Sequence, residues 1–307
     1  MQRLLITGID NIVGSNLALA LADRFDVFGL PTTSPSHWAD DCGSAHDVVQ
    51  LTRAICEARP HRVIHCSQLS INQWDQDSIA LSNGADRCER EIAGHLIELT
   101  QSIGAQLTAV LSDAVFVGPT TYHNERSTDW ASGSLGQRIR EVEELCLASD
   151  ALVVRTHVYG WSPGDSQQSF AERLLGALSD GVEIRADGTR YASPILAADL
   201  ADLLAQAFSH EISGLVHLSG AERTNQYRFA CELASALNVA APRVSEIAKV
   251  AASESETSLR SMRGSEIPGM KLPLLRDGLT RFVEQARADW RKRCGWQTAQ
   301  AGLQHAA

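Results

Sequence analysis

Short apolar runs alternate with amphipathic segments through the first half of the chain. The runs are short and unbroken, which is typical of strands buried on both faces of a parallel sheet. They predict strands over Arg3–Thr7, Asp26–Leu30, Arg62–Cys66, Gln106–Leu111 and Leu152–Thr156. The segments between them have apolar residues at helical spacing and predict helices over Ile12–Arg24, Val48–Ala58, Asp86–Ile103 and Ser134–Ser149.

The second half of the chain has a less regular pattern. One further strand is predicted over Leu215–Leu218, and the segments Gly181–Ala186 and Tyr191–Pro194 look extended. The polar segment Ser253–Ser265 is expected to be an exposed loop. Helical spacing predicts helices over Ser169–Leu178, Ala197–Phe208, Asn225–Leu237 and Leu274–Arg293.

Strands separated by helices in this order indicate βαβ units and hence an α/β fold with a doubly wound parallel Rossmann sheet. We expect residues 1–160 to form the core with this sheet. Residues 161–296 would form a smaller C-terminal lobe that interleaves with the core. The polar, Ala-rich tail 297–307 is expected to fray.

Charge and composition narrow the possible partners. The formal net charge of −10 argues against nucleic acid or an anionic membrane surface, because both attract basic patches. No apolar segment approaches the roughly 20 residues of a membrane span, and the start of the chain lacks the features of a signal peptide. The seven cysteines form no Cys-x-x-Cys pair, which argues against a metal site and fits reduced thiols. We therefore expect a cytoplasmic protein.

A glycine-bearing turn, Thr7-Gly8-Ile9-Asp10-Asn11-Ile12-Val13-Gly14, joins the first strand to the first helix. The first glycine permits a tight turn, and the last lets the helix pack closely on the sheet. Asn11 stands where a middle glycine usually lets the backbone approach a pyrophosphate, so its side chain either narrows that approach or replaces a phosphate contact. The turn predicts cofactor contacts from Gly8, Asp10, Asn11, Ile12 and Gly14. The alternative is a turn that needs glycine for its geometry alone.

The residue after the second strand usually sets the type of cofactor, because a carboxylate there holds the ribose 2′-hydroxyl of NAD. Here the segment reads Leu30-Pro31-Thr32-Thr33-Ser34, without an acid or an arginine. The hydroxyl of Thr32 suits either NADP or NAD, and the missing acid slightly favours NADP. Cys66 ends the third strand and Ser67 follows it, where ligands of such sheets bind, so both are further candidates for cofactor contacts. Simple burial is the alternative.

Four segments carry motifs that occur together in one known family. Ala109–Phe116 resembles Ser-Thr-Asp-Tyr-Val-Phe, and Val153–Gly160 resembles an Arg-Thr-x-x-Val-Tyr-Gly strand end. Tyr191–Ala201 resembles Gly-Ser-Pro-Thr-x-x-x-Asp-Leu-Ala, and Gly214–Gly220 matches Gly-x-x-His-Leu-Ser-Gly. Through these motifs the chain resembles the extended short-chain dehydrogenases, and most of all the dTDP-4-dehydrorhamnose reductases. The resemblance implies that residues 1–160 form an NAD(P)-binding Rossmann core and residues 161–296 a substrate-side lobe, with a nucleotide-sugar or other small-molecule ligand.

The resemblance also exposes a departure from the family's chemistry. Relatives use a Ser or Thr, a Tyr and a Lys four residues after that Tyr, where the phenol exchanges a proton with the substrate oxygen. The Ser/Thr position carries over to Ser112. The Tyr and Lys positions carry over to Leu135 and Ile139, which cannot transfer a proton. No Tyr-x-x-x-Lys occurs anywhere in the chain, and no lysine precedes Lys249.

Other groups offer weaker candidates for chemistry or binding. Asp113 and Tyr122 are possible substitute acids or bases, although a loop cap and a surface residue are the commoner roles. Tyr159 either lines the cofactor site or packs in the core. Arg190 and Arg260 fall where relatives hold nucleotide-sugar phosphates, and solvated surface arginine is the alternative.

Two classes of function follow. In the first, the chain is a non-catalytic or regulatory relative of sugar-nucleotide reductases that binds NAD(P) and acts through a protein partner or as a homodimer. In the second, it is an atypical reductase, epimerase or non-redox lyase that uses Ser112, Asp113 or Tyr122 on a nucleotide-sugar-like or other polar substrate.

Overall fold

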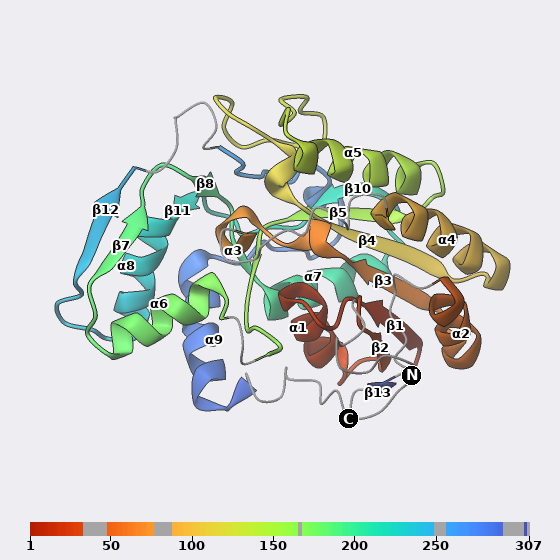
Figure 1. The fold of residues 1–307 in the computed structure, drawn as a ribbon, viewed down its shortest axis with the longest axis horizontal. Helices are drawn as coiled ribbons and strands as arrows, with labels where there is room; N and C mark the ends of the chain where they lie inside the picture. Colours follow the sequence, from red (N-terminus) through yellow and green to blue (C-terminus); the bar gives the residue numbers. More distant parts are fainter. Residues whose placement is uncertain (33–47, 77–87, 165–167, 249–255, 291–303, 306–307) are drawn as a thin grey trace.

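The computed structural model describes residues 1–32, 48–76, 88–164, 168–248, 256–290 and 304–305. Figure 1 shows a central sheet with helices on both faces and a smaller lobe beside it. Thr33 and Ser34 of the segment after the second strand, and most of the predicted tail 297–307, lie outside the described residues.

The central sheet contains six parallel strands among the described residues. They are β1 (Arg3–Thr7), β2 (Asp26–Leu30), β3 (Arg62–Cys66), β4 (Gln106–Ser112), β5 (Leu152–Thr156) and β10 (Gly214–His217). Their order is β10-β5-β4-β3-β1-β2, and the short β13 (Gln304–His305) pairs antiparallel with β2. This confirms the predicted doubly wound parallel sheet.

Two helical layers cover the sheet, and the strands contribute apolar side chains to the core under each layer. In β1, Leu4 and Ile6 belong to one buried core while Leu5 belongs to the other, as the alternation of a strand requires. The first core is covered by α1 (Ile12–Leu21) and α7 (Ala197–Ser209). The second is covered by α2 (Val48–Ala58), α4 (Cys88–Ile103) and α5 (Ser134–Leu147).

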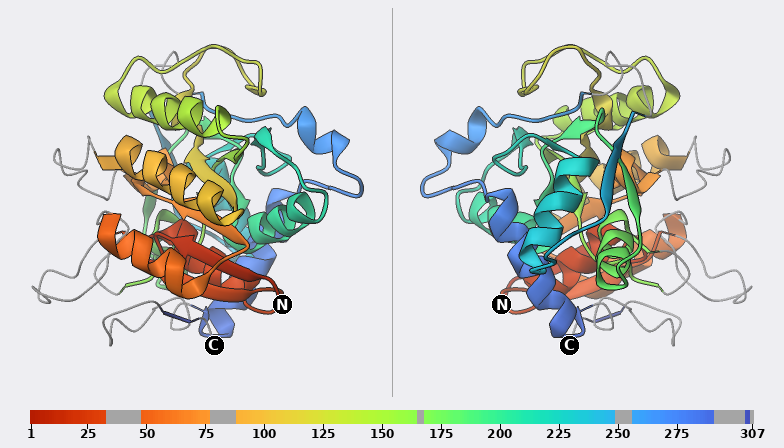
Figure 2. Two further views of the ribbon diagram at one scale, coloured as in Figure 1. Left: turned by 90° about the vertical axis from the view of Figure 1, so that its right-hand side faces the viewer. Right: turned by 90° about the vertical axis from the view of Figure 1, so that its left-hand side faces the viewer.

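The smaller lobe has a third core that is rich in aromatic side chains. Trp74, Phe229 and Phe282 are at most 2% exposed and lie within it. The right-hand view of Figure 2 faces this lobe. Its main elements are α6 (Phe170–Ser179), β7 (Ile184–Asp187), α8 (Gln226–Ala236), β12 (Val244–Ile247) and α9 (Leu275–Arg287).

Short elements connect the lobe to the sheet. Although α7 and β10 follow residue 160, they belong to the layers of the central sheet rather than to the lobe. The short elements are η1 (Gln68–Ser70), α3 (Gln73–Gln76), η2 (Asp113–Val115), β6 (Val158–Tyr159), β8 (Tyr191–Ala192), β9 (Ile195–Leu196), β11 (Thr224–Asn225) and η4 (Arg263–Glu266). No helix of the described chain is long and apolar enough to cross a membrane.

The prediction of an exposed loop over Ser253–Ser265 was wrong for residues 256–259, which are buried. Glu256 pairs with Tyr191 and Leu259 with His123 through isolated β-bridges. These bridges satisfy backbone groups that would otherwise need water, so a polar segment is buried without losing its hydrogen bonds. The chain thereby passes beside the ends of the central strands.

Candidate functional site

The glycine turn lies at the point where the strand order reverses, between β1 and β3. Gly8 has a φ of +79°, and a Cβ on it would stand 1.6 Å from the carbonyl oxygen of Cys66. A Cβ on Gly14 would stand 2.2 Å from the carbonyl oxygen of Gly8. Both positions therefore require glycine. In open α/β sheets, this reversal point at the carboxyl ends of the strands is where dinucleotides bind.

Asn11 spans this crevice and caps α1. Its backbone is extended, with φ −119°, so the turn does not require a left-handed conformation at this residue. Its Oδ1 accepts hydrogen bonds from the N–H groups of Val13 (2.9 Å) and Gly14 (3.0 Å). Its Nδ2 donates to the carbonyl oxygen of Cys66 at 2.9 Å. The amide thus uses two N–H donors that a helix N-terminus can offer to a phosphate.

A carboxylate lies at the end of β2, although no acidic residue follows that strand directly in the sequence. Asp10 reaches from the glycine turn to Thr32, and its Oδ1 accepts from the Thr32 N–H at 2.7 Å. The Thr32 hydroxyl donates to the same carboxylate at 3.0 Å. Thr32 is fully buried, whereas Asp10 is exposed. The Asp10 side chain therefore lies at the surface, beside the end of β2.

Other residues expected to contact the cofactor are more enclosed. Burial raises the pKa of the Cys66 thiol, which stays neutral. Ser67 is 1% exposed, and its hydroxyl caps η1 by accepting from the N–H of Leu69. Ile12 is the first residue of α1 and is 7% exposed.

The residues of the turn fit a dinucleotide. The fit rests on the two tight glycines and on the polar pair Asp10 and Thr32 at the neighbouring strand end. The position of Asn11 predicts that the pyrophosphate contact is weaker than in a turn with glycine at this position, because its Oδ1 competes for the same donors.

A second polar group lies at the ends of β4 and β5, and we call it the Asp113 cluster: Ser112, Asp113, His157 and Thr257. The Asp113 carboxylate is fully buried and accepts from three side chains. The donors are Ser112 Oγ at 3.2 Å, His157 Nδ1 at 2.8 Å and Thr257 Oγ1 at 2.5 Å. These contacts hold the carboxylate in one orientation.

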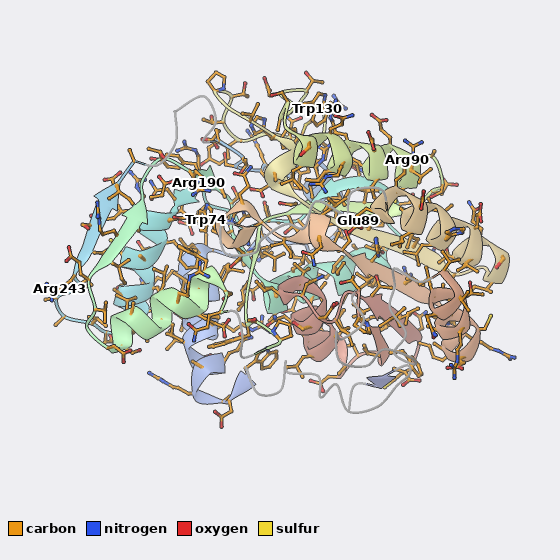
Figure 3. The ribbon with its side chains drawn as sticks, viewed as in Figure 1. Trp74, Glu89, Arg90, Trp130, Arg190 and Arg243 are labelled. Carbon is orange, nitrogen blue, oxygen red and sulfur yellow. The ribbon has the colours of Figure 1, made fainter. Side chains whose placement is uncertain are left out.

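His157 is the member of the cluster best suited to proton transfer. A carboxylate only accepts, so the bond to Asp113 places the proton of a neutral imidazole on Nδ1 and leaves Nε2 as an acceptor. His157 is 1% exposed, and its Nε2 has no hydrogen-bond partner among the described residues. The Trp74 ring meets it edge-on at 4.6 Å, and Figure 3 shows Trp74 between the sheet and the smaller lobe.

The two apolar residues of α5 lie against the core on the side of η2. Ile139 is fully buried in the same core as Ala114 and Val115, which follow Asp113. Leu135, one turn earlier, is half-buried and packs against that core. This face of α5 therefore supports the sheet through apolar contacts.

The two tyrosines among the candidates lie apart from the Asp113 cluster in different ways. The Tyr122 side chain is 43% exposed, while its N–H donates to the Ser258 hydroxyl at 2.9 Å. Tyr159 is 2% exposed and packs on Phe229 with ring centroids 5.0 Å apart. Burial, and secondly the nearby Asp199, raise the pKa of Tyr159. These contacts favour the packing role for Tyr159.

The two candidate arginines are placed differently from each other. The Arg190 Nε donates to Asp187 at 3.0 Å, so its guanidinium is engaged within the smaller lobe (Figure 3). Arg260 is exposed, and its backbone N–H donates to the carbonyl oxygen of His123. No contact between the two side chains is found in the described part of the chain.

Comparison with known proteins gives the family. A family model described as the RmlD substrate binding domain matches residues 1–288. The chain belongs to the RmlD substrate binding domain family. This match confirms the resemblance that the sequence motifs indicated. A comparison with curated proteins finds no match.

Solved structures share the fold of this RmlD-family chain. One is dTDP-4-dehydrorhamnose reductase from Bacillus anthracis str. Ames in complex with NADP, with 20% identity, a TM-score of 0.76 and coverage of 92% of this chain and 99% of that chain. A hypothetical dTDP-4-dehydrorhamnose reductase from Sulfolobus tokodaii has 23% identity, a TM-score of 0.72 and coverage of 90% and 98%. The Bordetella bronchiseptica enzyme WbmH in complex with NAD+ has 16% identity, a TM-score of 0.69 and coverage of 94% and 99%.

Sequence reasoning missed two members of the Asp113 cluster in this RmlD-family chain. His157 follows β5 directly, and the parallel register pairs Ser112 with Thr156. The next residues, Asp113 and His157, are therefore neighbours, and a register drawn from the sequence alone would have paired them. Thr257 gave no such signal, because its place depends on the return of residues 256–259 to the strand ends.

Arg155 and His217 lie in two of the motif segments of the sequence. Their buried side chains contact each other and the Phe116 ring. Arg155 is 1% exposed and binds Glu143 through Nε at 2.7 Å and Nη2 at 2.5 Å. Its Nη1 donates to the Nε2 of His217 at 3.2 Å, which requires a neutral imidazole. Burial lowers the pKa of His217 to about 4; Glu125 raises it, while Arg155 lowers it.

We predict that His217 makes the free energy of unfolding depend on pH between about 6.5 and 4. In that window the unfolded chain binds a proton at this position and the folded chain does not, so stability falls as the pH falls. The loss attributable to His217 between pH 7 and pH 5 is about 2 kcal/mol. Urea unfolding at both pH values should show a smaller loss in His217→Gln than in the unsubstituted protein. Equal losses would contradict the prediction.

Proposed function

We propose that the chain is an NAD(P)-binding relative of the sugar-nucleotide reductases that does not use the family's Tyr–Lys route. It acts as a non-catalytic or regulatory protein, through a protein partner or as a homodimer. The observation that carries the proposal is the α5 face, where Leu135 and Ile139 pack into the core at the positions of the proton donor and its lysine. Neither side chain can donate a proton to a substrate oxygen.

The proposal assigns the cofactor to the crevice between β1 and β3. Gly8 and Gly14 would let the pyrophosphate approach the start of α1, and Asp10 with Thr32 would face the adenosine ribose. When bound, a nicotinamide cofactor supplies or accepts a hydride. A nucleotide-sugar-like ligand would lie between the strand ends and the smaller lobe.

Titration with NADH by calorimetry tests the binding half of the proposal. We expect saturable binding with one site per chain, because the glycine turn and the Asp10–Thr32 pair are both in place. Absence of heat and of thermal stabilisation at millimolar NADH would contradict it.

A related prediction concerns Asn11. Asn11→Gly should strengthen NADH binding about tenfold, because it frees the Val13 and Gly14 N–H groups for charge-assisted bonds to the pyrophosphate. The matched control is Asn225→Gly. Asn225 caps α8 through the Arg228 N–H and donates to the carbonyl oxygen of Gly188, so it repeats the contacts of Asn11 away from the crevice.

Each substitution should cost about 1 kcal/mol in the free energy of unfolding, from the lost cap and hydrogen bond. Only Asn11→Gly should change the NADH dissociation constant. An unchanged or weaker affinity in Asn11→Gly would show that Asn11 does not compete with the phosphates.

A second candidate function is supported by the Asp113 cluster. His157 is held by Asp113 and presents Nε2 without a hydrogen-bond partner in the described structure, beside the strand ends where ligands of such sheets bind. In an atypical reductase, epimerase or lyase, Nε2 would exchange the proton, and Asp113 would fix the orientation of the ring. Loss of activity in His157→Gln, with no change in cofactor affinity, would favour this candidate.

A further inference from the structure

We infer that the dinucleotide site selects NAD(H) over NADP(H), and that Asp10 decides the choice. The inference rests on the proposed function, because it requires a dinucleotide in the crevice. It departs from the slight preference for NADP that the sequence suggested, since that preference relied on the missing acid after β2. The structure supplies the acid from another segment of the chain.

The position of the Asp10 carboxylate carries the inference. The Gly8 N–H donates to the carbonyl oxygen of Leu30 at 2.7 Å, which holds the glycine turn against the last residue of β2. From this turn Asp10 binds both the N–H and the hydroxyl of Thr32, two residues beyond the strand. An acid beyond the second strand of a dinucleotide-binding sheet hydrogen-bonds the ribose 2′-hydroxyl. Asp10 occupies that place although it precedes the strand in sequence.

Charge makes this position selective. A carboxylate oxygen accepts from a 2′-hydroxyl, and the Asp10 side chain is exposed at this point. A 2′-phosphate has only acceptor oxygens and carries negative charge, so it is repelled at hydrogen-bonding range. Relatives of NADP-binding type accommodate the phosphate with an arginine near this point. The segment from Pro31 to Asp47 contains no arginine or lysine to do so.

Asp10→Asn isolates the charge from the geometry. An asparagine Oδ1 still accepts from the Thr32 N–H, so the turn keeps its hydrogen bond while the negative charge is removed. The matched control is Asp26→Asn, which removes a charge at the opposite, amino end of β2. Asp10→Ser serves as a second variant in case the asparagine rearranges the turn.

Calorimetric titration of each protein with NADH and with NADPH tests the inference. We expect the unsubstituted protein and Asp26→Asn to bind NADH at least about tenfold more tightly than NADPH. In Asp10→Asn and Asp10→Ser the ratio should fall to within about threefold, mainly because NADPH binds more tightly.

The outcomes separate the inference from the proposed function. Equal affinities in the unsubstituted protein, or a preference that survives both Asp10 substitutions, overturn the inference alone. Binding of neither nucleotide overturns the inference together with the proposed function. An NADH preference that depends on Asp10, in a protein that oxidises NADH with a 4-keto sugar nucleotide, supports the inference and overturns the proposed function.

Discussion

Ile139→Lys should lower the free energy of unfolding by at least about 3 kcal/mol. Ile139 is fully buried in the core between α5 and the sheet, together with Ala114 and Val115. An ammonium group there must lose its hydration or push the helix away from the sheet. The lysine that the resemblance places at this position in relatives would therefore destabilise this chain.

The control is Gln137→Lys, on the exposed side of the same helix, which should change stability by less than about 0.5 kcal/mol. Leu135→Tyr should have a smaller effect than Ile139→Lys, because Leu135 is only half-buried. Urea unfolding followed by circular dichroism measures all three. A free energy of unfolding unchanged by Ile139→Lys would show that this face of α5 opens to solvent, and would remove the main support for a non-catalytic protein.

Much of the fold follows from local patterns in the sequence. The strands β1, β2, β3 and β5 have the predicted bounds, because short apolar runs between helices leave few alternatives. The helices begin or end within a few residues of the predicted positions, and α2 has the predicted bounds. The short strands of the smaller lobe were harder to predict from sequence, since β7 and β12 pair across about sixty residues.

The candidate site was only partly predictable, because its decisive contacts are non-local. Gly8 and Gly14 were evident from spacing, and Ser112 and Asp113 from the motif. Asn11 caps α1 through nearby N–H groups, but its second bond, to the Cys66 carbonyl, crosses the crevice. The pairing of Asp10 with Thr32 joins two loops. The hydroxyl of Thr257 bonds Asp113 from 144 positions away in the sequence.

The second large effect concerns the reaction itself. A positioned general acid contributes roughly 10²–10⁴ in rate, and the proposed function holds that this contribution is missing where Leu135 and Ile139 stand. The buried ring of His157 is the one alternative that the Asp113 cluster favours. Reduction of a 4-keto sugar nucleotide should therefore be slower than in a Tyr–Lys reductase by at least about this factor, whatever the affinity for the cofactor.

Incubation of the protein with NADH or NADPH and dTDP-4-dehydrorhamnose tests the central claim most directly. The absorbance of the reduced nicotinamide is followed beside a Tyr–Lys reductase of the family and a sample without protein. We predict cofactor binding, but no oxidation above the rate without protein. Substrate-dependent oxidation at a rate comparable to that of the reductase would contradict the account.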